Sequence, residues 1–210
     1  MSDIKPAVST GPADTRIRIL DAAERLLRAS GSAEFSMREL AGEAGLSFAT
    51  PFNQFGSKTA IMQALSARRI DAMVERFAVV APTGRAAERV LAAVDIAVGV
   101  LLEEPVVSRP VIGSLGSPTG EPGQTAERSR GLWAMALGDR EGIAPELIEI
   151  ARISLPDLLA FGFRGCLSFW VAGEIGDADL APRARQTAVA LLLGFVAPEH
   201  RPVLIQQLAG

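Results

Sequence analysis

The side chains best suited to binding chemistry stand close together in the first third of the chain, between residues 47 and 58. Asn53 and Gln54 carry amides that both donate and accept hydrogen bonds, which matches the major-groove edge of an adenine base. Phe48 and Ala49 offer apolar contact to a thymine methyl group. Hydrogen bonding and apolar contact are the chemistry of recognition, so these positions are candidates for reading DNA bases.

Three neighbouring side chains suit the phosphate backbone instead. Lys58 stands at the start of a predicted helix, where an ammonium group adds its charge to free backbone amides. Thr50 supplies a hydroxyl group, and Arg38 supplies a guanidinium group that suits a phosphate or a base. For each candidate the alternative is a solvated surface side chain without a ligand.

The elements that position these residues follow from a series of caps and turns. Ser36 and Glu39 form a capping box, which marks a helix start, and apolar residues then follow at helical spacing. Gly45 ends this helix, because glycine takes a positive φ at little cost. Ser47 is the predicted cap of a second helix, and Ser57 is the predicted cap of a third. The first two helices and their short turn predict a helix-turn-helix, whose second helix enters the major groove of DNA.

Residues 15–65 resemble the DNA-binding domain of the TetR family of bacterial transcriptional regulators. Many anchor positions of that family occur here at the family's spacing, over about a quarter of the chain. The residues that match outright are Ala41, Ala44, Gly45, Ser47, Thr50, Phe55, Ser57 and Lys58. The resemblance implies an all-α fold, with an N-terminal three-helix helix-turn-helix domain and a C-terminal helical domain for ligand binding and dimerisation.

Three positions of the predicted recognition helix depart from the family. Pro51 replaces an aliphatic residue at the expected fourth helical position, where proline removes at most one backbone hydrogen bond. Phe52 replaces a tyrosine that in the family donates a hydrogen bond to a DNA phosphate. Gln54 replaces a histidine and keeps its hydrogen-bonding capacity without a titratable ring. Ser47 and Phe52 complete the candidate DNA-binding set, whose detailed contacts we expect to differ from those of the family.

The charge of the chain is weakly asymmetric. Its net charge is −3, which by itself does not favour binding to nucleic acid. Residues 1–70 hold nine Lys or Arg and seven Asp or Glu, a balance of +2, and the remaining residues have a balance of −5. Basic charge is therefore modestly concentrated where the helix-turn-helix lies. We expect affinity to require a dimer, which doubles the number of phosphate contacts.

Reactive residue types are too few for an active site or a metal site. The chain has one cysteine, Cys166, and one histidine, His200, so these residue types alone cannot hold a metal ion. Cys166 falls in an apolar predicted helix and is interpreted as an inert buried thiol, with redox sensing as the alternative. The most apolar window, residues 158–173, contains Arg164 and is shorter than a membrane span. We expect a cytoplasmic protein without signal peptide, cofactor or enzymatic activity.

The predicted elements divide the chain into three parts. Residues 1–13 are predicted to be a disordered arm, residues 14–62 the DNA-binding domain, and residues 63–210 the effector-binding and dimerisation domain. No strand pattern appears, and residues 113–123 are predicted to be a loop because of their glycines and prolines. Further helices are predicted over residues 57–80, 85–103, 124–139, 145–153, 156–173, 182–196 and 198–208.

The resemblance also implies a ligand cavity and a dimer interface among the later helices. Few polar residues interrupt these helices, which favours an apolar or aromatic effector. The candidate pocket residues are Phe77, Val98, Leu102, Trp133, Leu137 and Phe161. The candidate dimer residues are Leu158, Cys166, Phe169, Trp170, Ala188, Leu191, Leu192 and Phe195. Gly162, Gly165 and Gly173 are expected to let another helix approach closely. The alternative is that all these residues are the ordinary core of a monomer.

Together these features predict a homodimeric DNA-binding transcriptional regulator, which the resemblance implies to be a repressor. A small apolar or aromatic effector would release it from a near-palindromic operator in double-stranded DNA. The alternative is a helical small-molecule binding protein with weak or lost DNA binding. Pro51, Phe52 and the small positive charge favour that alternative.

Overall fold

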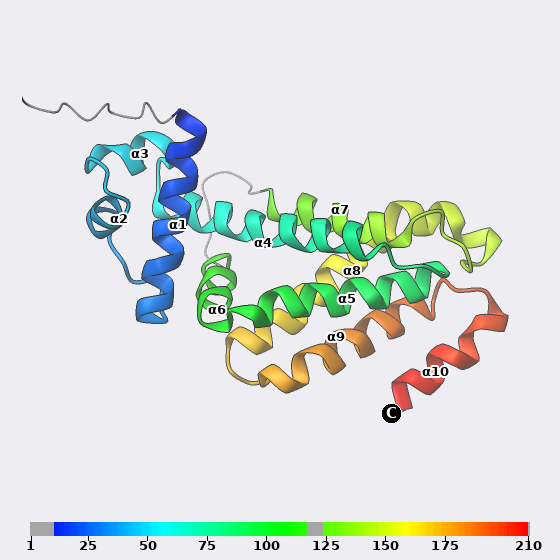
Figure 1. Cartoon of the computed structure of the whole chain (residues 1–210). Coiled ribbons are helices and arrows are strands. Elements are labelled where there is room, and N and C mark those ends of the chain that lie inside the picture. The colour runs from blue at the N-terminus through cyan, green and yellow to red at the C-terminus, as the bar shows by residue number, and fades with distance from the viewer. Residues whose placement is uncertain (1–10, 117–123, 210) are drawn as a thin grey trace, which may run out of the picture.

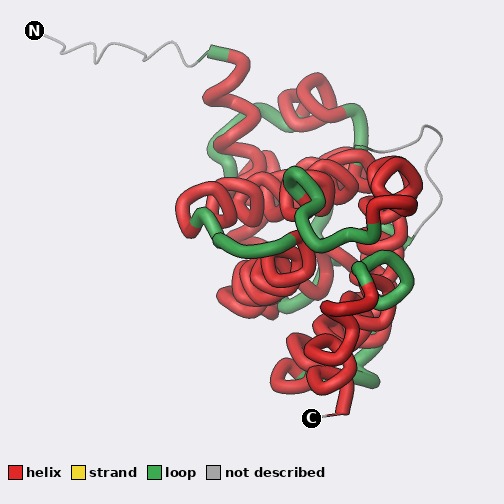
Figure 2. The backbone as a smooth tube through the Cα atoms, turned by 90° about the vertical axis from the view of Figure 1, so that its right-hand side faces the viewer, coloured by secondary structure: helices red, strands yellow, loops and turns green. Residues whose placement is uncertain are grey.

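The computed structural model describes residues 11–116 and 124–209, and within these ranges every extended regular element is a helix. Figure 2 shows the helical segments joined by loops. The only β-type pairing in this part of the chain is an isolated bridge between Ile143 and Val196. The predicted all-α fold is confirmed. Of the predicted disordered arm over residues 1–13, residues 1–10 lie outside the described ranges.

The first three helices form a small unit at one end of the molecule (Figure 1). They are α1 (Pro12–Ser30), α2 (Met37–Glu43) and α3 (Ala49–Phe55). Helix α1 begins earlier than predicted, because proline is tolerated at the first helical position, where its missing N–H has no partner anyway. Ile19 and Leu27 of α1 pack with Leu40 of α2 in a common core, so α1 holds the other two helices in place.

Helix α4 (Lys58–Val80) leads from this unit into the rest of the chain. Its first half contributes Ile61 and Leu65 to the core of the first three helices, and its second half contributes Met73 to a second core. The domain boundary proposed at residue 62 therefore lies inside a continuous helix.

The larger part of the molecule packs four long helices around the second core. These are α5 (Ala86–Glu103), α7 (Thr125–Leu137), α8 (Ile148–Val171) and α9 (Asp177–Leu192). Trp133 of α7 and Trp170 of α8 are fully buried there. Single 3-10 turns, Pro145–Leu147 and Pro198–His200, precede α8 and α10 (Arg201–Ala209). None of the described helices combines the length and hydropathy needed to cross a membrane.

Helix α6 (Pro105–Ser114) is an element that the sequence pattern does not predict. Pro110 lies inside it and removes one backbone donor, which normally breaks a helix. Val107 and Val111 on one face are fully buried against the core that contains α1. Tertiary packing of this face therefore outweighs the unfavourable local propensity.

Three predicted boundaries are wrong for related reasons. The loop over residues 113–123 begins inside α6, and residues 117–123 lie outside the described part of the chain. The helices predicted on either side of Pro156 are one continuous helix, α8. Pro182 lies inside α9, which opens at Asp177, five residues before the predicted start at residue 182. In α8 and α9 the burial of the helix outweighs the local effect of its proline.

Candidate nucleic-acid interface and ligand cavity

Two of the three predicted caps of the helix-turn-helix, Ser36 and Ser57, are present in the structure. The Glu39 amide donates to Ser36 Oγ at 3.1 Å, and the Ser36 amide donates to Glu39 Oε2 at 2.6 Å, which completes the capping box. These hydrogen bonds with Ser36 lower the pKa of the Glu39 carboxyl. Gly45 has φ +63°, as the turn requires. Ser57 Oγ accepts from the Ala60 amide at 3.1 Å and caps α4.

Arginines of α1 hold the turn and the recognition helix α3. Arg18 Nη2 donates to the Ala44 carbonyl at 2.8 Å, at the carboxyl end of α2. Arg16 donates to the Gln54 carbonyl and its guanidinium lies 4.0 Å from the centre of the Phe55 ring. Carbonyls at helix ends lack partners inside the helix, so a cation there is well placed. These arginines therefore position the motif.

The exposed face of α3 presents two aromatic rings. Phe48 is 53% exposed and Phe52 is 41% exposed, and their centroids lie 5.7 Å apart in an edge-to-face arrangement. The Arg38 guanidinium lies 5.5 Å from the Phe48 ring. Ala49 and Asn53 are exposed beside them. The structure thus brings these five sequence candidates to one solvent-facing surface.

The start of α3 differs from the prediction. Ser47 Oγ lies 2.8 Å from Thr50 Oγ1 and caps no backbone amide, and the helix begins at Ala49. Pro51 is then the third helical residue and is buried. No intrahelical hydrogen bond is lost there, because the first four amides of any helix lack such partners. Thr50 and Gln54 are half-buried, so less of each side chain faces solvent than at Asn53.

Lys58 is engaged inside the protein. Its Nζ donates to the Phe35 carbonyl at 2.7 Å and lies 4.6 Å from the centre of the Phe35 ring. Other cations of this region are also paired internally, for example Arg68 with Asp21 at 2.7 Å. Among the described residues up to position 70, Arg38 is the cation without a carboxylate or carbonyl partner. Few of the described cations of this region are therefore free to meet a phosphate in this conformation.

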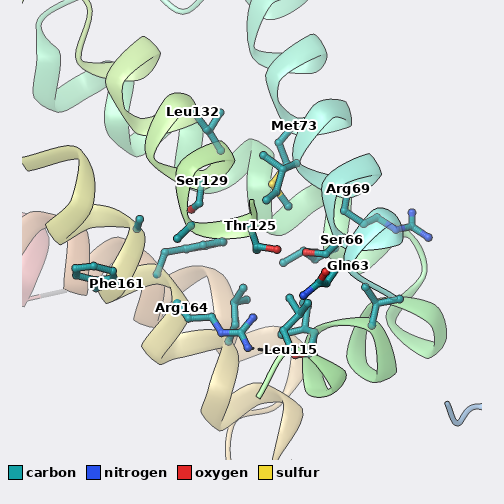
Figure 3. Close-up of a pocket in the computed structure, with 18 of the residues that line it drawn as sticks. Gln63, Ser66, Arg69, Met73, Leu115, Thr125, Ser129, Leu132, Phe161 and Arg164 are labelled. Carbon is teal, nitrogen blue, oxygen red and sulfur yellow. Dashed lines mark hydrogen bonds between the residues drawn. The ribbon is translucent and has the colours of Figure 1, made fainter. Parts of the chain in front are cut away.

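A cavity of about 320 Å³ lies between α4, α6, α7 and α8. In Figure 3 the polar ends of Gln63, Ser66 and Thr125 turn toward its interior. Phe161 lines it while remaining 65% exposed, which places this ring at the mouth. Much of the wall is apolar, with side chains from Ile70, Met73, Leu101, Leu132, Phe163 and Leu167. A volume and lining of this kind are typical of small-molecule sites.

The cavity includes only part of the predicted pocket. Trp133 and Phe161 line it. Phe77, Val98 and Leu137 are instead buried in the second core, and Leu102 packs against that core. Two kinds of lining residue were not anticipated. The side chains of α6 could not be predicted because the sequence pattern does not predict that helix. The polar residues could not be predicted because helical apolar spacing does not identify them.

Arg164 of α8 brings an uncompensated charge to the cavity. Its side chain is half-buried, and Nη2 donates to the Ile112 carbonyl at 3.2 Å. Burial lowers the pKa of the Arg164 guanidinium, because desolvation disfavours the charged form. The guanidinium nevertheless keeps its charge, because arginine is not deprotonated in proteins. Among the described residues no carboxylate forms an ion pair with it.

Two residues connect the cavity to the helix-turn-helix. Val111 of α6 lines the cavity and is also buried in the core that contains α1. Arg69 of α4 lines the cavity, and its Nη2 lies 3.6 Å from Glu24 of α1 and 3.3 Å from Glu104 between α5 and α6. Val111 and Arg69 therefore contact both the cavity and the DNA-binding unit.

The predicted dimer residues fall into two groups. Leu158 and Phe169 are exposed on α8, and Leu191 and Phe195 are half-buried. Helical geometry turns the remaining candidates toward the protomer's own core, where Cys166, Trp170, Ala188 and Leu192 are buried. Those four cannot form the surface of an interface in this conformation.

The outer face of α8 carries apolar side chains that are uncovered in the single chain. Phe161 and Phe169 lie about two turns apart on this face, and both are more than half exposed. Ile153 is also more than half exposed, but it lies on nearly the opposite side of the helix from Phe169. Gly162 lets α9 come close, because a Cβ atom there would lie 2.9 Å from Thr187 Cγ2. The predicted close approach is confirmed at Gly162, where the neighbour is α9 of the same chain. It is wrong at Gly165 and Gly173, where an added Cβ atom would meet nothing within 4 Å.

The comparisons with known proteins agree with this architecture. Residues 19–65 match the family model described as bacterial regulatory proteins, tetR family. No curated protein sequence matches the chain. A TetR transcriptional regulator from Rhodococcus sp. RHA1 is 23% identical, with a TM-score of 0.71 over 87% of this chain and 98% of the other. TylP, a TetR regulator from Streptomyces fradiae, is 19% identical, with a TM-score of 0.58 over 94% of this chain and 92% of the other.

A third similar structure is a gamma-butyrolactone receptor, an ArpA-like protein. It is 14% identical, with a TM-score of 0.53 over 94% of this chain and 96% of the other. At these identities the solved structures establish the fold, and the family model identifies the DNA-binding domain. Residues 19–65 therefore match the DNA-binding domain of the TetR family, and the chain as a whole has the fold of TetR regulators of known structure.

Proposed function

We propose that the protein is a repressor that binds a near-palindromic DNA operator as a homodimer and leaves it when a small effector occupies the cavity. The observation that carries this proposal is the double role of Val111, which lies both in the cavity wall and in the core of the DNA-binding unit. Such a protein works in the cytoplasm, beside the DNA that it regulates.

The exposed face of α3 supports direct reading of bases. Asn53 is proposed to bind an adenine edge, with Gln54 beside it, and the Phe48 ring and the Ala49 methyl are proposed to contact thymine methyl groups. Apolar contacts of this kind would contribute part of the DNA affinity that the region does not gain from charge. Arg38, Ser47, Thr50 and Lys58 are proposed to contact phosphates. Phe52 has no polar group and is proposed to contact the DNA through its exposed ring.

A dimer is supported by the apolar outer face of α8. Phe161 and Phe169 are 65% and 53% exposed there. Two large apolar side chains exposed on the same face are typical of a protein–protein contact. Pairing α8 and α9 with their copies would cover this face. Two recognition helices about 34–36 Å apart would then enter successive major grooves and read a near-palindrome.

Release of DNA is proposed to follow from a difference in effector affinity between two arrangements of α6. An effector that binds better to one arrangement of Val111 and Arg69 shifts the population toward it, and the DNA-binding units move with these residues. The mostly apolar wall favours an effector with an apolar or aromatic body.

The test is an electrophoretic mobility shift with purified full-length protein and fragments of the region upstream of its own gene. We expect a sequence-preferring complex whose affinity falls as salt rises, because phosphate contacts release counterions. A matched fragment of scrambled sequence is the control. Equal affinity for both fragments, or no complex at low salt, would rule out the proposed repressor.

A second candidate is a helical small-molecule binding protein with weak or lost DNA binding. The internal pairing of Arg16, Lys58 and Arg68 favours it, because these cations are not free to meet phosphates. Ligand binding without any preference for the upstream fragment would support this candidate.

A further inference from the structure

The cavity holds a positive charge that the described residues do not neutralise. Arg69 and Arg164 line it, and no Asp or Glu is found among its described lining residues. Arg69 is compensated by Glu24 and Glu104, and in Figure 3 its guanidinium points away from the cavity. Arg164 has the Ile112 carbonyl as its only protein partner in the described part of the chain.

The guanidinium of Arg164 is half-buried and has no carboxylate partner, so it favours the binding of an anionic ligand. Removing a charge from water is costly unless a partner of opposite sign replaces the water. The planar fork of Arg164 presents parallel donors that match the two oxygens of a carboxylate. A cation would be repelled, and a neutral molecule would displace water from the guanidinium without neutralising it.

The other polar groups of the cavity are neutral. Trp133 is 1% exposed and lines the cavity, and its indole nitrogen has no hydrogen-bond partner among the described residues. Ser66 and Thr125 add hydroxyl groups whose ends turn toward the interior (Figure 3). These groups suit an additional oxygen of the ligand, but they do not balance a second negative charge. A single anionic group therefore fits better than a phosphate, which carries close to two charges.

We propose that the effector is a monocarboxylic acid with an aliphatic or aromatic body, held by a bidentate pair between its carboxylate and Arg164. The proposal rests on the function proposed above, in which this cavity is the effector site, and it adds the chemical class of the ligand. The body of the acid lies against the apolar wall formed by residues such as Leu132, Phe163 and Leu167, with Phe161 at the mouth.

The experiment compares three acids with their primary amides. Octanoate, 4-phenylbutanoate and 2-naphthoate are titrated into the full-length protein by calorimetry beside octanamide, 4-phenylbutanamide and 2-naphthamide. Each pair has nearly the same shape and differs in charge. We expect at least one acid to bind roughly 10- to 100-fold more tightly than its amide, which is the range for a hydrogen-bonded charged group.

Three variants separate the charge of Arg164 from its packing. Arg164→Gln removes the charge, and we expect it to bind the acid and the amide equally. Arg164→Lys keeps a positive charge without the planar fork, and we expect it to retain part of the preference for the acid. Arg152→Gln is the matched control, because Arg152 also lies on α8 but is exposed and paired with Glu149 at 3.0 Å. It should bind like the unchanged protein.

The outcomes distinguish this proposal from the proposed function. Amides that bind as well as acids, a preference for acids that survives Arg164→Gln, or no binding by any of the six compounds would each overturn the carboxylate proposal. The mobility shift with upstream DNA is measured separately without ligand. If a specific DNA complex forms and none of the acids affects it, the proposed regulator is supported and the proposed effector class is wrong. If acids bind through Arg164 but no DNA complex forms, the proposed ligand site is supported and the proposed regulator is wrong.

Discussion

Glu104 Oε1 accepts two hydrogen bonds from Arg28, from Nε at 3.0 Å and from Nη2 at 2.6 Å. Arg28 lies in α1 and Glu104 lies between α5 and α6, so this pair joins the DNA-binding unit to the helices of the effector cavity. The hydrogen bond from Arg28, and then that from Arg69, lower the pKa of the Glu104 carboxyl below its ordinary value.

The Glu104 pair makes stability depend on acidity. Because the pKa is lower in the folded state, the stabilisation is complete above the ordinary carboxyl range and is lost as pH falls through the folded-state pKa. Glu104→Gln should therefore lower stability near neutral pH by less than about 1 kcal/mol, since the pair is partly exposed. The difference from the unchanged protein should shrink as pH falls below about 4. Thermal unfolding from pH 3 to pH 7 measures this, with Glu149→Gln on α8 as the control. A constant difference at every pH would contradict it.

Lys58 is proposed to contact phosphate, although it now donates to the Phe35 carbonyl. Lys58→Ala should weaken binding to all DNA sequences alike and reduce the salt slope by about 1. Lys58→Met is the matched control for packing on the Phe35 ring, and it should weaken DNA binding to the same extent. Fluorescence anisotropy at several salt concentrations measures both. An unchanged salt slope would mean that Lys58 has a purely structural role.

Asn53 is exposed on α3 and is proposed to read an adenine. Asn53→Ala should cost about 1–3 kcal/mol on the preferred operator and relax the preference at one base position. Competition binding with operators substituted one base pair at a time measures this change. A uniform loss over all the substituted operators would instead assign Asn53 to the phosphate backbone.

Val111 and Val107 allow a matched test of the connection between the cavity and the DNA-binding unit. Both are buried in the same core, but only Val111 lines the cavity. Each change to alanine should destabilise the fold by roughly 2 kcal/mol, because two methyl groups of buried contact are lost. Only Val111→Ala should also change how far a bound effector lowers DNA affinity. An equal change in effector response by both variants would show that stability alone controls it.

Phe169 tests the proposed dimer interface on α8. Phe169→Glu should convert the dimer to a monomer, since it places a charge in an apolar contact, and should weaken operator binding. Ile205→Glu on α10 is the control, because Ile205 is equally exposed but belongs to another helix. Sedimentation velocity measures the oligomeric state. A dimer that survives Phe169→Glu would move the interface away from this face.

The parts of the structure that the sequence predicts well are those set by near neighbours. The capping box of Ser36 and Glu39, the positive φ of Gly45 and the cap at Ser57 each depend on a few consecutive residues. The exposed face of α3 follows from these boundaries and from helical periodicity. Phe48 and Asn53, the candidates for reading bases, lie at the surface for the same reason.

The cavity could not be predicted in the same way, because it depends on how distant helices pack. Helix α6 contains Pro110, so local propensity argues against it, and only the burial of Val107 and Val111 explains its formation. In the sequence, Arg164 is only a charged residue within an apolar helix. Its position in the wall of the cavity depends on how α4, α6 and α7 pack around α8.

The position of α6 also affects how such proteins can be recombined. An exchange of residues 11–62 for the corresponding segment of a relative would transfer the recognition helix but leave Val107 and Val111 behind. The grafted α1 would then meet a helix whose side chains are matched to a different surface. A functional hybrid therefore requires that α6 travel with the DNA-binding segment, although more than forty residues separate them in the chain.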